Sequence, residues 1–104
     1  MENTTTISFK VGQILTTSNI SSEIKKDPAF AKFCNSSLQR HISCDWGDLC
    51  EEDKFSNNES LIGEDRLFSV YNLPEDLYVM RNKKIYIITE WDRSVTTILF
   101  PSEY

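Results

Sequence analysis

The sequence predicts an α+β fold in which N-terminal helices pack on a C-terminal antiparallel β-meander of three to four strands, with an added short N-terminal strand. Two observations predict this class. Apolar residues recur at helical spacing between residues 28 and 42, whereas from residue 66 onward they recur with a period of two. Helices that precede a run of strands are typical of α+β proteins. Because 104 residues suffice for one core and not two, we expect residues 1–104 to form a single domain.

The N-terminal region predicts one short strand. Residues 1–6 are polar, and we expect them to be flexible. Apolar and polar residues then alternate from Ile7 to Val11, which is the period of a half-buried strand. A short strand is therefore predicted between Ile7 and Thr17.

A first helix is predicted from Asp27-Pro28 to about Ile42. Asp27 is a favourable N-cap, and Pro28 fits the first helical position. The apolar stripe of this helix consists of Phe30, Phe33, Cys34, Leu38 and His41. Such a stripe is the face that a helix buries against a sheet.

A second helix is predicted from Asp48 to about Ser60. Gly47 permits a turn before it, and Asp48 followed by Glu51 has the spacing of a reciprocal N-cap. The few apolar residues in this segment predict a surface helix that exposes most of its circumference to solvent.

The C-terminal half predicts strands because it is rich in β-branched and aromatic residues between polar turns. The predicted strands are Leu67 to Tyr71, Leu77 to Met80, Ile85 to Glu90, and Val95 to Phe100. Their predicted connections are Leu73 to Asp76, a two-residue turn at Asn82-Lys83, and Trp91 to Ser94.

Negative charge is concentrated in one segment. Between Asp45 and Asp65 there are eight acidic residues and one base, Lys54, which gives −7; the whole chain carries −5, so the other 83 residues carry +2. Such a segment attracts basic surfaces, although a solvated helix face would explain it equally. The acidic balance argues against direct binding to nucleic acid.

The candidate partner-binding residues follow from this charge. Trp46 lies beside the acids and is either an aromatic anchor at an interface or a core residue that holds the loop between the helices. The full candidate set is Asp45, Trp46, Asp48, Glu51, Glu52, Asp53, Glu59, Glu64 and Asp65.

Two constellations suggest metal chemistry. Cys34, His41, Cys44 and Cys50 lie within 17 positions but lack a CxxC pair. His41, Asp45 and Asp48 could form an oxygen-rich cation site or an acid–base pair. No established catalytic motif accompanies either set. We therefore predict no catalytic residues, no metal and no cofactor, and keep a small metal-dependent enzyme around His41, Asp45 and Asp48 as an alternative.

The hairpin tip from Thr89 to Ser94 is polar and aromatic, which is typical of binding loops. In the simpler interpretation Asp92 and Ser94 build the turn, and Arg93 pairs with a nearby carboxylate. The chain has no membrane-spanning run and no export signal, so a cytoplasmic protein is expected.

Three stretches carry a resemblance to a known family. They are HISCDWGDLCEED (41–53), RLFSVY (66–71) and IITEWDRSVTTILFPSEY (87–104). They resemble small acidic proteins of bacterial plasmids, phages and other mobile elements, often described as plasmid-related proteins, over residues 30–104. Glycine is usual in that family where Cys44 stands, and a cysteine at position 50 departs from the pattern. The family brings no enzymatic activity with it.

Small acidic proteins of mobile elements often resemble inhibitors of host defence, including anti-CRISPR inhibitors of Cas9. The resemblance therefore implies a non-enzymatic inhibitor in the bacterial cytoplasm. Its expected partner is a Cas nuclease or restriction enzyme with a basic nucleic-acid-binding groove. A plasmid-maintenance accessory protein that binds another partner is a further alternative.

Overall fold

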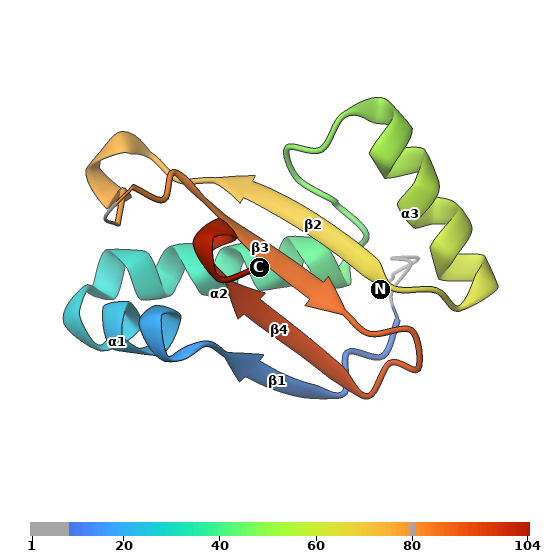
Figure 1. The fold of residues 1–104 in the computed structure, drawn as a ribbon, viewed down its shortest axis with the longest axis horizontal. Helices are drawn as coiled ribbons and strands as arrows, with labels where there is room; N and C mark the ends of the chain where they lie inside the picture. The colour runs from blue at the N-terminus through green and yellow to red at the C-terminus, as the bar shows by residue number, and fades with distance from the viewer. Residues whose placement is uncertain (1–8, 80) are drawn as a thin grey trace, which may run out of the picture.

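The computed structural model describes residues 9–79 and 81–104, and in this part of the chain it confirms the α+β class. The elements follow one another as β1 (Gln13–Thr16), α1 (Ser18–Lys26), α2 (Pro28–Ile42), α3 (Glu51–Gly63), β2 (Leu67–Asn72), η1 (Glu75–Leu77), β3 (Lys84–Thr89), β4 (Val95–Leu99) and η2 (Pro101–Glu103) (Figure 1). Here η denotes a 3₁₀ helix. Residues 1–6, expected to be flexible, lie outside the described residues.

The four strands form one mixed sheet in the order β1-β4-β3-β2. β2, β3 and β4 make the predicted antiparallel meander, with Tyr71 opposite Ile85 and Ile87 opposite Ile98. β1 lies within the predicted window and pairs in parallel with β4. It is therefore an edge strand.

The core lies between one face of the sheet and the helices α1 and α2; in Figure 1, α2 passes behind the strands and α1 lies at the left, beyond the end of β1. Ile20 of α1 and Phe30 and Cys34 of α2 are buried against alternate residues of the strands. Those strand residues are Tyr71, Ile85, Ile87 and Ile98, and Phe100, directly after β4, joins them. Asp27 caps α2 as predicted, because its Oδ1 accepts a hydrogen bond from the Ala29 amide at 3.0 Å.

α3 lies apart from this layer, beside the edge formed by β2 (Figure 1). Its N-cap is Cys50, and no side chain caps it, so the predicted reciprocal cap of Asp48 and Glu51 is wrong. The Asp48 carboxylate instead accepts a hydrogen bond from the Asn72 amide at 2.8 Å.

Three other details differ from the sequence prediction. α1 was not predicted, and it starts where the Thr17 hydroxyl accepts a hydrogen bond from the Ile20 amide. The strand predicted from Leu77 to Met80 is wrong in its described part, because Pro74 leads into the 3₁₀ turn η1. Val79 and Asn82 exchange backbone hydrogen bonds of 3.2 and 2.8 Å, so Asn82 pairs with Val79 and the predicted two-residue turn at Asn82-Lys83 is wrong.

Among the described residues, every helix is too short or too polar to cross a bilayer.

Candidate functional site

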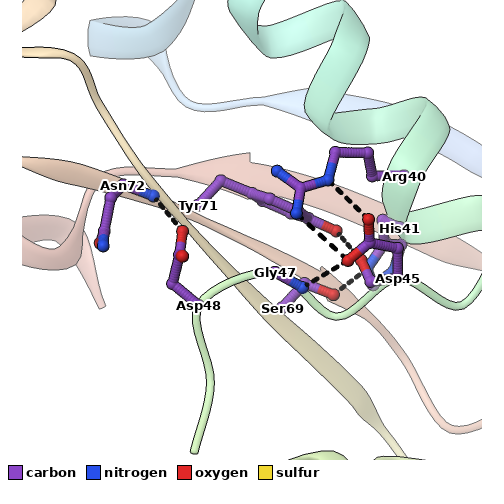
Figure 2. Close-up of polar contacts among 8 residues, drawn as sticks. All are labelled: Arg40, His41, Asp45, Gly47, Asp48, Ser69, Tyr71 and Asn72. Atoms are coloured by element: carbon purple, nitrogen blue, oxygen red, sulfur yellow. Dashed lines mark hydrogen bonds and ion pairs between the residues drawn. The ribbon is translucent and has the colours of Figure 1, made fainter.

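The loop that precedes α3 pairs with the outer edge of β2. The Asp48 amide donates to the Val70 carbonyl at 2.7 Å, and the Val70 amide donates to the Trp46 carbonyl at 3.3 Å. The Asp48 carboxylate then accepts a hydrogen bond from the Asn72 amide, two residues further along the strand (Figure 2). The loop thus satisfies backbone groups that an edge strand would otherwise expose.

Gly47 permits this close approach. Its φ is 77°, a left-handed conformation that glycine adopts without steric cost. A Cβ at this position would collide with the Val70 carbonyl and would lie 2.7 Å from the Tyr71 ring. The glycine therefore determines how closely the loop, and α3 behind it, approach the sheet.

Trp46 is a core residue and not an exposed anchor. Its side chain is 3% exposed, and its Nε1 donates to Asn58 Oδ1 at 3.0 Å. The indole lies 5.7 Å from the His41 ring and 6.0 Å from the Phe9 ring, measured between centroids. The structure therefore supports the second interpretation of Trp46, in which it is a core residue that holds the loop between the helices.

Cys44 ends α2 in a conformation that glycine favours. Its φ is 64°, its amide donates to the His41 carbonyl at 3.0 Å, and the Asp45 amide donates to the Arg40 carbonyl at 2.8 Å. These two bonds form a Schellman motif, and Cys44 occupies the position where glycine is most common.

We expect Cys44→Gly to raise the free energy of unfolding by about 1 kcal/mol relative to Cys44→Ala, because only glycine relieves the left-handed strain. Urea unfolding at neutral pH measures the difference. The alanine variant is the matched control, since both replacements remove the thiol. Equal stability of the two variants would show that position 44 is unstrained.

Asp45 and Asp48 are held by groups within the molecule. Arg40 Nε and Nη2 lie 2.7 and 3.2 Å from the Asp45 carboxylate, which also accepts the Gly47 amide at 3.1 Å (Figure 2). The hydrogen bonds from Arg40 hold the pKa of Asp45 below its ordinary value. These two carboxylates position the loop, and both residues are exposed at the surface.

The remaining acids are all exposed and lie on α3 or just beyond its end. Glu51, Glu52 and Asp53 form the first turn of the helix, where its dipole favours negative charge. Glu59 lies about two turns further on, and Glu64 and Asp65 follow the last turn. The ion pair found for this group is Glu51 with Lys54, at 3.4 Å.

Two large apolar side chains share the outer face of α3 with these acids. Phe55 is 65% exposed and Ile62 is 83% exposed. At 100° per residue, these two side chains and the acids Glu51, Glu52 and Glu59 fall within one arc of about 100°. This arc lies on the side of the helix opposite the buried Asn57. The outer face of α3 therefore consists of Glu51, Glu52, Phe55, Glu59 and Ile62, whereas Asp53, one turn before Asn57, is exposed on the Asn57 side of the helix.

Asn57 fastens the middle of α3 to the sheet. Its Nδ2 donates to the Phe68 carbonyl at 2.6 Å, and its Oδ1 accepts the Phe68 amide at 3.2 Å. No pattern in the sequence distinguishes Asn57, because its burial and its contact with Phe68 both depend on how α3 packs beside β2.

Arg93 fastens the end of α3. Its guanidinium donates to the Ser60 carbonyl at 3.2 Å and to the Asp65 carbonyl at 2.7 Å. It therefore binds backbone carbonyls at the helix C-terminus, where cations are favoured, and not the predicted carboxylate. In the same hairpin, Asp92 accepts hydrogen bonds from the Ser94 amide and hydroxyl, which confirms that these two residues build the turn.

The residues of the alternative enzyme site are directed away from one another. His41 is fully buried, with Nδ1 2.5 Å from Ser69 Oγ and Nε2 2.9 Å from Thr89 Oγ1. Asp45 and Asp48 instead meet Arg40 and Asn72 at the surface (Figure 2). Within residues 9–79 and 81–104, no three His, Cys, Asp or Glu side chains are grouped to hold a metal.

The cysteines do not complete a zinc site with His41 either. Cys34 is buried in the core and Cys50 is exposed beside α3. Burial raises the pKa of the Cys34 thiol to about 12, so this side chain stays protonated and is a poor metal ligand.

Comparison of this chain with protein-family models, with curated proteins and with solved structures finds no match.

Proposed function

We propose that this protein is a non-enzymatic inhibitor of a nucleic-acid-targeting defence enzyme, such as a Cas nuclease or a restriction enzyme. In this proposal the outer face of α3 occupies the basic groove in which the enzyme binds nucleic acid. The proposal includes an origin on a bacterial mobile element and action in the host cytoplasm, as the sequence resemblance implies.

The observation that carries the proposal is the outer face of α3. Glu52 and Glu59 are exposed on it, and Glu51 meets only Lys54 among the described residues. Helical geometry spreads this face over about 17 Å between residues 51 and 62. Carboxylates so arranged can accept the paired N–H groups of arginines that otherwise grip phosphates.

The two apolar side chains complement the charges. Acids alone give fast, salt-sensitive association, whereas affinity comes mainly from apolar anchors buried at the centre of an interface. Phe55 and Ile62 lie between the acids and are the exposed apolar residues of α3. A groove that combines arginines with an apolar floor therefore fits this surface better than a purely basic one.

The proposal rests on a rigid attachment of α3. Asn57 holds the middle of the helix, Arg93 holds its end, and Trp46 packs beneath the loop at its start. Because the helix is held at three points, little ordering entropy opposes binding.

We expect the double reversal Glu52→Lys/Glu59→Lys to weaken binding to the target nuclease by more than tenfold, because like charges would then face each other in the groove. Binding is measured by isothermal titration calorimetry with a Cas9 ribonucleoprotein and with a type II restriction enzyme, at low and high salt. The wild-type affinity should fall as salt rises, and nuclease cleavage should be inhibited in parallel.

Glu75→Lys/Asp76→Lys is the matched control. Both pairs change the net charge from −5 to −1, but Glu75 and Asp76 lie in η1, away from α3. The control should keep near wild-type affinity. If both pairs weaken binding equally, the effect is one of net charge and the outer face of α3 is not the binding surface.

A further inference from the structure

The two edges of the sheet differ in how they are covered. At β2, the loop residues Trp46 and Asp48 and the side chain of Asn57 meet the backbone of the strand. At the opposite edge, no described segment pairs with the outer side of β1 (Figure 1). Within residues 9–79 and 81–104, the outer side of β1 therefore has no strand partner.

The hydrogen bonds to β4 identify which backbone groups of β1 are open. The Gln13 amide donates to the Ser94 carbonyl at 2.9 Å, and the Thr17 amide donates to the Ile98 carbonyl at 3.2 Å. In a parallel ladder alternate residues bond to the neighbouring strand. The N–H and C=O groups of Ile14 and Thr16 consequently point outward.

β1 is short, with four residues, but it lacks the charges and prolines that protect many edge strands. Its sequence, Gln-Ile-Leu-Thr, contains no charge and no proline. Ile14 and Leu15 are each 40% exposed and, as neighbours in a strand, lie on opposite faces of the sheet. A strand added here would cover apolar surface on both faces.

The charge distribution indicates which partner would pair with the open edge of β1. Residues 9–22 and strand β4 contain one charged residue, Lys10, and the nearby Glu103 carboxylate accepts hydrogen bonds from Thr17 and Asn19, so this edge offers a charged partner little to recognise. The acidic helix α3 lies at the other edge of the sheet (Figure 1). Two copies joined through β1 would keep their acidic helices at opposite ends, whereas contact through α3 would bring like charges together.

We propose that two copies of this chain pair through β1, antiparallel about a two-fold axis at Leu15, to form one continuous eight-stranded sheet. Ile14 of each copy then lies opposite Thr16 of the other, and all outward backbone groups of both residues are paired. Leu15 lies opposite Leu15 as a non-hydrogen-bonded pair. This two-fold arrangement is the commonest form of oligomer and does not depend on the proposed function.

Cysteine cross-linking tests the register. In a non-hydrogen-bonded antiparallel pair the Cα atoms lie about 4.5 Å apart, which is within the range that a disulfide spans. Leu15→Cys in a Cys50→Ser background should therefore give a disulfide-linked dimer on mild oxidation. Ile62→Cys in the same background is the control, because it is more exposed but lies on α3, and it should form no disulfide-linked dimer under the same conditions.

Light scattering after size exclusion tests the association itself. The wild-type protein should be a dimer, and Leu15→Lys should weaken it by more than tenfold by placing like charges directly opposite each other. Ile62→Lys should leave the dimer intact. A monomeric wild type, a dimer that Leu15→Lys does not weaken, or a dimer lost only in Ile62→Lys would overturn the proposal. If Leu15→Lys does not fold, the cross-linking result decides.

Discussion

Replacing Gly47 with alanine is expected to destabilise the protein by about 4 kcal/mol or more, the range in which backbone collisions and strained φ values combine. The added methyl group would collide with the Val70 carbonyl and the Tyr71 ring, and the residue would keep a φ of 77°. Relief requires the loop to leave β2, which breaks the hydrogen bonds of Asp48 to Val70 and Asn72. Urea unfolding followed by far-UV circular dichroism measures the loss.

Gly63→Ala is the control for this prediction. Gly63 is the last residue of α3, its φ is not positive, and the nearest atom to an added Cβ is 3.7 Å away. Alanine should leave stability unchanged or raise it by up to about 1 kcal/mol. Similar losses at both glycines would contradict a specific role for close packing at Gly47.

Acidification is expected to remove about 3 kcal/mol of stability through His41 alone. Burial first, and the positive charge of Arg93 second, lower the pKa of His41 to about 4 from an ordinary 6.5. Above pH 6.5 the imidazole is neutral in both states and its contribution is fully present. Between pH 6.5 and 4 the unfolded chain binds a proton that the folded chain rejects, so stability falls as pH falls.

The neutral ring belongs to a buried polar chain that protonation would disturb. His41 meets Ser69 and Thr89, Thr89 Oγ1 lies 2.7 Å from Thr96 Oγ1, and Thr96 donates to the Val11 carbonyl. A hydroxyl that donates to one ring nitrogen loses its acceptor when that nitrogen gains a proton. Protonation of His41 would therefore disturb hydrogen bonds in each of the segments that bear these residues.

His41→Gln provides the comparison. It keeps a polar side chain but does not titrate, and it shares every carboxylate with the wild type. Urea unfolding at several pH values between 7 and 4 should show a stability loss that is about 3 kcal/mol smaller in the variant. Parallel pH profiles would contradict a neutral His41 as the acid-sensitive group.

The sequence predicted those elements whose own residues carry a strong pattern. α2 has a cap and a wide apolar stripe, and the meander has β-branched strands with polar turns. α1 was missed because its nine residues are mostly serine, asparagine, lysine and glutamate, with Ile20 and Ile24 as the apolar pair. Tertiary packing on the sheet, and not local pattern, stabilises such a short helix.

The candidate site was predicted in composition but not in detail. The density of acids between residues 45 and 65 is visible in the sequence, and most of these acids are exposed on or near α3. Which of them are held by internal partners depends on contacts across the fold, such as Arg40 with Asp45 and the Asn72 amide with Asp48. The burial of Trp46 depends equally on residues distant in sequence.

Because Arg93 donates hydrogen bonds to carbonyls at the end of α3, the orientation of that helix depends on a turn about 30 residues further along the chain. Arg93 is held at a φ of 61° in the turn that Asp92 and Ser94 build, so the reach of its guanidinium is set by the length of that turn. Inserting or deleting one residue there would tilt a helix whose own sequence is untouched. Homologues with every glutamate retained but a longer turn would present those glutamates at another angle.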